Sequence, residues 1–135
     1  MIIIMVENFK TIKFNNCEEI VEKKSRFIAN LIYVESEDEA LNKIKEIKKK
    51  HYDARHNCFA YRVLDGESIV QRSSDDGEPS GTAGDPMLNI LEKNNIVNVL
   101  VVVTRYFGGI LLGTGGLVKA YSDATLKILD TNEFV

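Results

Sequence analysis

Hydrophobic and polar residues alternate along several short stretches of the chain, a pattern typical of half-buried β-strands. Residues 9–14 and 28–33 are rich in β-branched and aromatic side chains, so the sequence predicts two strands with a turn at Asn15-Asn16 between them. Residues 58–64 and 68–72 alternate around Asp65-Gly66, a strong turn sequence. This second pair is predicted to form a β-hairpin.

Three other stretches carry apolar residues at helical spacing. Ser36 followed by Glu39 is a capping box, which predicts a helix over Glu37–Lys50 with its lysines on the face opposite to its apolar residues. Asp85-Pro86 begins a second helix that continues through residues 87–91, after an irregular loop over residues 73–86. A last helix is predicted from one apolar stripe, formed by Leu117, Ala120, Tyr121, Ala124 and Ile128, with Leu126 on the opposite face.

An almost unbroken apolar run over residues 97–103 predicts the central strand of the sheet. The element order is then strands, helix, hairpin, helix, strand and helix. This order favours an α+β fold, a two-layer sandwich with the helices on one face of a mainly antiparallel or mixed sheet. We expect a single domain over residues 1–135.

Composition and charge narrow the class of protein. The chain has 135 residues, 44% hydrophobic and 27% charged, as expected for a globular domain. No apolar run reaches the length of a membrane helix, and the run at residues 1–6 is too short for a signal peptide, so we expect a cytoplasmic protein without a membrane partner. Cys17, in a predicted turn, and Cys58, in a strand, lack the spacing of a zinc site and are expected to be reduced.

A glycine-rich connection leads from the predicted central strand into the last helix. Glycine lets backbone N–H groups approach an anion closely, and a helix N-terminus adds a positive dipole end. The connection therefore indicates a site for phosphate or a nucleic-acid backbone, although glycines that serve only tight turns and close packing explain it equally well. Its glycines are Gly108, Gly109, Gly113, Gly115 and Gly116.

Three other groups of residues are candidates for chemistry. Asp75, Asp76 and Glu78 could hold Mg²⁺, but a role in turn structure or in pairing with arginine is the more common one. His56 and Cys58 share one strand face, yet nothing identifies the other parts of a nucleophilic site. Between residues 41 and 56 six basic side chains face two acidic ones, which suggests a local basic patch although the net charge is −3. The basic residues are Lys43, Lys45, Lys48, Lys49, Lys50 and Arg55.

Three blocks of sequence together resemble the YigZ/IMPACT family. They are Lys24-Ser25-Arg26-Phe27-Ile28, residues 53–61, and the paired segments 74–86 and 101–121. Within the last pair, Asp-Asp-Gly-Glu-Pro-Ser-Gly-Thr-Ala-Gly and Thr-Arg-Tyr-Phe-Gly-Gly-Ile-Leu-Leu-Gly-Thr-Gly-Gly-Leu-Val are similar to the family's signature. The similarity covers residues 24–129.

This resemblance implies an Impact N-terminal domain with a ribosomal protein S-five domain-two-like fold and a left-handed βαβ crossover. It also implies a link to translation, through RNA, the ribosome or a translation-regulatory protein, with no catalytic residues to carry over. Bacterial members of the family usually continue into a ferredoxin-like domain, which we expect to be absent here. The oligomeric state stays open.

The sequence thus predicts a non-catalytic binding domain without cofactor or metal. Two alternatives remain: a Mg²⁺-dependent enzyme of phosphoryl transfer or phosphoester hydrolysis, and a protein-interaction module whose glycines are structural. The candidate anion-binding residues are Arg105, the five glycines Gly108, Gly109, Gly113, Gly115 and Gly116, and Lys119, with Arg26, Arg55 and His56 as weaker additions.

Overall fold

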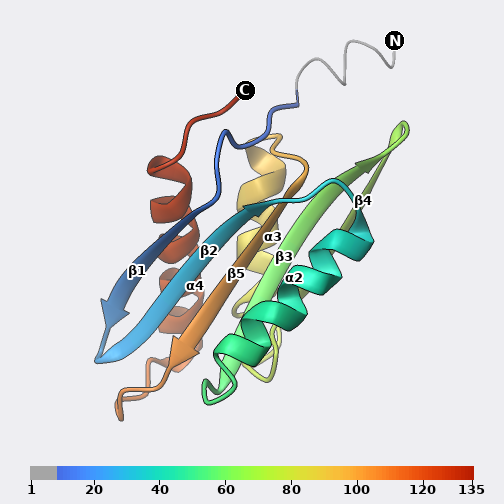
Figure 1. Ribbon diagram of the computed structural model, residues 1–135. Coiled ribbons are helices and arrows are strands. Elements are labelled where there is room, and N and C mark those ends of the chain that lie inside the picture. The colour runs from blue at the N-terminus through green and yellow to red at the C-terminus, as the bar shows by residue number, and fades with distance from the viewer. Residues whose placement is uncertain (1–8) are drawn as a thin grey trace.

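The computed structural model describes residues 9–135, and it shows one five-stranded sheet with three helices (Figure 1). The prediction for the apolar run at residues 1–6 lies outside the described residues. The elements follow the order β1 (Asn16–Glu22), β2 (Ser25–Tyr33), α2 (Glu37–Lys50), β3 (His56–Asp65), β4 (Ser68–Ser74), α3 (Gly84–Lys93), β5 (Val99–Tyr106) and α4 (Gly113–Asp130).

The sheet confirms the α+β class and the central strand. Its strand order is β1-β2-β5-β3-β4, and every neighbouring pair is antiparallel. The sequence predicts a mainly antiparallel or mixed sheet, and the named strands form the antiparallel one. The β3–β4 hairpin, the last helix with its buried stripe, and the helix over Glu37–Lys50 are also confirmed. Ser36 Oγ accepts a hydrogen bond from the Glu39 N–H at 3.1 Å, as the capping sequence predicts.

The prediction that all helices lie on one face of the sheet is wrong. Helices α3 and α4 cover one face, and α2 covers the β3 and β5 half of the other (Figure 1). The reason lies in β5, which is buried on both faces: Val101 and Val103 belong to the core under α3 and α4, whereas Leu100 and Val102 belong to the core under α2. The fold therefore has three layers rather than two.

The first predicted strand and its turn are also wrong. Residues 9–14 make only isolated bridges, Lys10 to Ile96 and Ile12 to Phe134, while Asn16 and Cys17 begin β1 itself. The hairpin turn falls at Lys23 and Lys24, which both have positive φ, 45° and 66°. Lysine rarely adopts this conformation, so no residue type in the sequence marks the turn.

Two crossovers connect parallel strands. The path from β2 through α2 to β3 passes over β5, and the path from β4 through α3 to β5 passes over β3 on the opposite face (Figure 1). In Figure 1 the second path turns left-handed, as the family resemblance implies and against the usual right-handed rule. Both crossovers bring loops to the end of the sheet where β5 finishes.

A pair of glycine substitutions tests how tightly this end of the sheet is packed. A Cβ at Gly108 would overlap the Lys24 carbonyl oxygen, whereas a Cβ at Gly115 meets no atom within 4 Å. We expect Gly108→Ala to lower the free energy of unfolding by about 3 kcal/mol, because backbone must move. Gly115→Ala should raise it by about 0.5 kcal/mol, because alanine is the better helix former. Urea unfolding followed by circular dichroism measures both, and equal effects would contradict this packing.

Candidate functional site

The blocks that carry the family resemblance meet at one end of the sheet. In the strand register Arg105 lies opposite Phe27 of β2 on one side and His56 of β3 on the other. The acidic loop, defined as residues 75–83, follows β4 at this same end, and α4 begins there (Figure 1). Segments from five parts of the chain therefore form a single region.

A buried ion pair lies at the centre of this region. The Nη1 atom of Arg105 donates to both carboxylate oxygens of Glu78, at 3.0 and 2.9 Å, and both side chains are more than nine-tenths buried. The Tyr121 hydroxyl donates to the same carboxylate from α4. His56 Nε2 lies 3.5 Å from Glu78 Oε1. Arg105 thus faces an internal carboxylate, and Glu78 joins the acidic loop to β5 and α4.

Cys58 lies beside this network, and its side chain is fully buried. Its thiol lies 3.1 Å from the Asp75 carbonyl oxygen and 3.4 Å from the Tyr121 hydroxyl. Burial raises the pKa of Cys58 far above its ordinary value, so the thiol stays protonated. The Nδ1 atom of His56 is held by the Asp76 carbonyl oxygen at 2.8 Å, a partner that can only accept. The geometry therefore gives no support to a Cys–His pair.

The carboxylates of the acidic loop are used within the protein. Asp75 accepts hydrogen bonds from the N–H groups of Gly81, Ala83 and Gly84, at 2.9, 3.1 and 2.9 Å, and so caps α3. Asp76 accepts from the Asn57 N–H at 2.7 Å. Within residues 9–135, no group of three or more His, Cys, Asp or Glu side chains is placed to hold a metal ion. The loop has the structural role that the sequence offered as the more common one.

The glycines of the β5–α4 connection, defined as residues 107–112, and of the start of α4 have different surroundings. Gly108 packs against Lys24, and its N–H donates to Ser25 Oγ at 3.2 Å. Gly109 and Gly113 have φ of +92° and +75°, which only glycine adopts freely. Helix α4 begins at Gly113 with no side-chain cap and no acidic residue in its first turn. Gly115 and Gly116 follow in that turn, and Gly115 is exposed.

The basic candidates divide into paired and unpaired side chains. Arg26 forms two 3.0 Å hydrogen bonds with Glu19, and Lys119 pairs with Asp123 at 2.6 Å. Arg55 is exposed, and its guanidinium lies 4.9 Å from the centre of the Phe107 ring. Within the described chain Arg55 has no ion-pair partner. Among the candidate arginines and lysines, Arg55 is thus the exposed side chain that lacks an acidic partner in residues 9–135.

Sequence reasoning gave no role in this region to Lys24 or Tyr121, whereas it named Glu78 as one of three carboxylates for which pairing with an arginine is a common role. Glu78 and Tyr121 complete the network around Arg105, and exposed Lys24 lies against Gly108 with no ion pair among residues 9–135. Lys24 was visible in the first family block, but its contact with a glycine 84 positions further along depends on strand register. No local signal reveals it.

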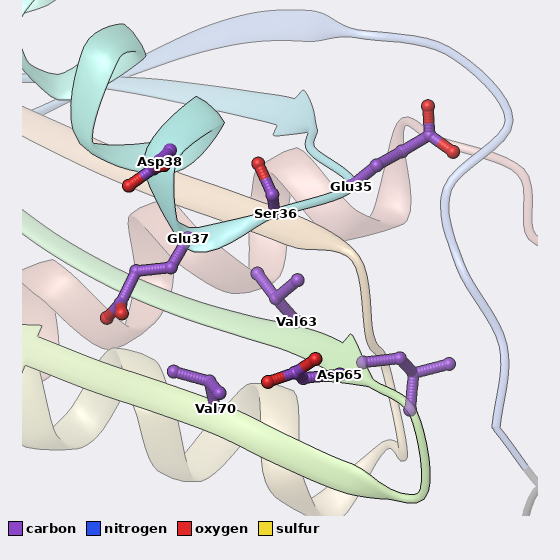
Figure 2. A pocket seen from close by; sticks show the side chains of 8 residues that line it. Glu35, Ser36, Glu37, Asp38, Val63, Asp65 and Val70 are labelled. Carbon is purple, nitrogen blue, oxygen red and sulfur yellow. The ribbon is translucent and has the colours of Figure 1, made fainter.

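The described chain also has a pocket at the opposite end of the sheet, where α2 begins. It encloses about 240 Å³, and Val63 and Val70 point from β3 and β4 toward the first turn of α2 (Figure 2). Four carboxylates line it, from Glu35, Glu37, Asp38 and Asp65. None of the candidate site residues lines this pocket.

Among residues 9–135, no helix is long and apolar enough to cross a membrane.

Comparison with known proteins shows the family. The Impact N-terminal domain model matches residues 23–129, and the chain belongs to this family. It is 51% identical over 126 residues to the IMPACT family member YvyE of Bacillus subtilis, covering 93% of this chain and 58% of that protein. The chain therefore spans little more than half the length of this relative.

Two solved structures resemble the fold. A crystal structure of a hypothetical protein matches with a TM-score of 0.88 and 38% identity, over 94% of this chain and 62% of that one. The structure of the two-domain translational regulator Yih1 matches with a TM-score of 0.60 and 28% identity, over 89% of this chain and 48% of that one. Both likenesses support the fold expected from the family resemblance.

The cap formed by Asp75 predicts a pH dependence of stability. Burial alone would raise the pKa of Asp75, but its hydrogen bonds from Gly81, Gly84 and Ala83 together lower the pKa below its ordinary value. A carboxylate with a lowered pKa stabilises the fold above about pH 4, and this contribution is lost as the pH falls through the pKa of the folded state.

We therefore expect Asp75→Asn to cost about 1 kcal/mol at pH 7 and progressively less below pH 4. Urea unfolding of both proteins at pH 7, 5 and 3.5 measures the difference. Asp85→Asn, at an exposed carboxylate in the first turn of the same helix, is the matched control. A cost that stays constant over this range would show that the Asp75 charge does not hold the loop.

The Glu78–Arg105 pair predicts a larger effect. Glu78→Gln removes the negative charge and leaves the buried Arg105 without its counter-ion, so we expect the free energy of unfolding to fall by about 3 kcal/mol. The double variant Glu78→Gln, Arg105→Met should recover part of this loss, because it no longer buries an unpaired charge. Urea unfolding of four proteins, the wild type, Glu78→Gln, Arg105→Met and the double variant, completes the cycle. Additive losses would mean that the two charges do not interact.

Proposed function

We propose that this chain is a translation-associated, non-catalytic binding domain that contacts RNA phosphates, free or in the ribosome, through the β5–α4 connection and the start of α4. Two facts about similar proteins support the link to translation: the family membership and the fold shared with the translational regulator Yih1. Such a protein would act in the cytoplasm, as the sequence predicts.

One observation carries the proposal. Two exposed basic residues without ion pairs among residues 9–135 border the β5–α4 connection: the backbone of Lys24 packs against Gly108, and the Arg55 guanidinium lies over the Phe107 ring. The connection leads into a helix end without a side-chain cap. Cations and a helix N-terminus are the groups that bind phosphate oxygens. Close approach of the backbone to a phosphate would be allowed by Gly109, Gly113, Gly115 and Gly116. Lys119 and Arg26, although each pairs with a carboxylate of the protein, would add further positive charge.

Arg105 and His56 have a different place in this proposal. Their side chains lie behind the surface, next to Glu78, so they position the acidic loop and β5 rather than contact phosphate directly. Gly108 likewise shapes the connection through its contact with Lys24. The sequence hypothesis of an anion site is therefore retained, with contact assigned to the more exposed candidates.

The alternative of a Mg²⁺-dependent enzyme gains no support from the acidic loop. Its carboxylates, which would have to bind the ion, accept hydrogen bonds from backbone N–H groups and from Arg105. A protein-interaction module with structural glycines explains Gly108, but it leaves the unpaired cations without a role. A pull-down from cell extract with and without nuclease separates this last alternative from RNA binding.

The proposal predicts salt-dependent RNA binding. Fluorescence anisotropy with a short labelled RNA should show affinity that falls steeply between 50 and 200 mM salt, on the order of tenfold or more for several phosphate contacts. Arg55→Ala and Lys24→Ala should each weaken binding and reduce the slope of log K against log salt by about 0.7. Lys93→Ala, at an exposed lysine in the last turn of α3, is the control and should change neither.

Absence of RNA binding at 50 mM salt would overturn the proposal. Calorimetry with ATP, with and without Mg²⁺, tests the enzymatic alternative on the same protein. Binding of the nucleotide that requires Mg²⁺ would favour that alternative instead.

A further inference from the structure

The β5–α4 connection carries two aliphatic side chains into solvent at its tip. Leu111 is 80% exposed and Ile110 is 42% exposed. Single exposed leucines are common on protein surfaces and need no explanation. Ile110 and Leu111 differ from such single leucines because they are adjacent, because the backbone around them is held by contacts with the rest of the domain, and because basic residues lie nearby.

The stem of the connection is fixed by contacts with two neighbouring strands. Gly108 lies against the Lys24 carbonyl and its N–H donates to Ser25 Oγ. The guanidinium groups of Arg55 and Arg105 lie over the Phe107 ring, 4.9 and 5.6 Å from its centre. Gly109 and Gly113 then bend the chain on either side of the two aliphatic residues. The tip is thus held outward before any partner binds, which reduces the entropy lost on binding.

The charge around the tip favours a polyanion as the partner. Lys24, whose backbone contacts Gly108, and Arg55, whose guanidinium lies over Phe107, are exposed and have no ion-pair partner in residues 9–135. The helix that follows has no acidic residue in its first turn. A purely apolar pocket on a protein would leave these cations unmatched. RNA presents phosphates beside base faces, so it matches both the cations and the aliphatic tip.

An aromatic ring lies at the same end of the sheet. Tyr52 is 84% exposed, and it follows His51, whose ring lies 5.7 Å from that of Tyr106 at the end of β5. Exposed aromatic rings stack on bases that are not paired, and aliphatic side chains enter steps where base stacking is broken. A perfectly paired duplex offers neither surface.

On these grounds we propose that the domain recognises RNA where bases are unpaired, with Ile110 and Leu111 wedged against unstacked bases and Tyr52 stacked on a further base. This inference rests on the proposed function and names the feature of the RNA that the same site selects. The cations supply attraction to any RNA, whereas the apolar side chains supply the preference for unpaired bases.

The test compares two labelled RNA hairpins of equal length and charge, each closed by a non-nucleotide linker so that the loop presents no bases, one fully paired in its stem and one with a bulge of four unpaired bases. The wild-type protein should bind the bulged hairpin about tenfold more tightly in anisotropy titrations. Leu111→Ala and Tyr52→Ala should each remove much of this preference and leave the salt slope unchanged, because they carry no charge. Leu126→Ala, at a leucine 45% exposed on α4, is the matched control and should keep the preference.

The outcomes separate this inference from the proposed function. Equal affinity of the wild-type protein for both hairpins, or a preference that survives in Leu111→Ala, overturns the inference while salt-dependent RNA binding still stands. Failure to bind either hairpin at 50 mM salt overturns both. Circular dichroism of each variant establishes that the exposed substitutions leave the fold intact.

Discussion

The ion pair between Glu78 and Arg105 is the interaction on which the rest of the structure depends. A carboxylate buried away from water is costly unless charged and neutral donors surround it. Glu78 finds its donors on β5 and α4, 27 and 43 residues further along the chain. The acidic loop is thereby fixed against the end of the sheet. Asp75 of that loop in turn caps α3. The buried charge of Glu78 therefore fixes the positions of β5, α4 and α3 relative to one another.

The elements that sequence could predict are those whose signals are local. The capping box at Ser36 and the apolar run of β5 each depend on neighbouring residues, and both gave the correct element. β1 could not be predicted, because its polar residues resemble a loop and its turn uses two lysines where glycine or asparagine would be expected. The placement of α2 on the second face of the sheet could not be predicted either. The apolar run of β5 shows that both faces of this strand are covered, but it does not indicate which helix covers each face.

The irregular backbone after β5 was predictable from the sequence, but the surroundings of each candidate residue were not. Glycines mark where backbone takes unusual paths, and they correctly pointed to the connection after β5. Whether a glycine faces solvent or another strand depends on pairing between distant segments, as the contrast between Gly115 and Gly108 shows. The surroundings of Arg105 likewise depend on a carboxylate 27 residues earlier, which only the folded chain brings beside it.

The distribution of charge along α2 has a consequence for how the domain would meet a large anion. Its first turn carries Glu37, Asp38 and Glu39, its last turn carries Lys48, Lys49 and Lys50, and the whole chain has a net charge of −3. A molecule of this kind is repelled by a polyanion in most orientations, yet the field exerts a torque that turns its lysine-bearing end forward. The domain would therefore approach a polyanion with its lysine-bearing end forward. The rest of its surface would bind polyanions only weakly.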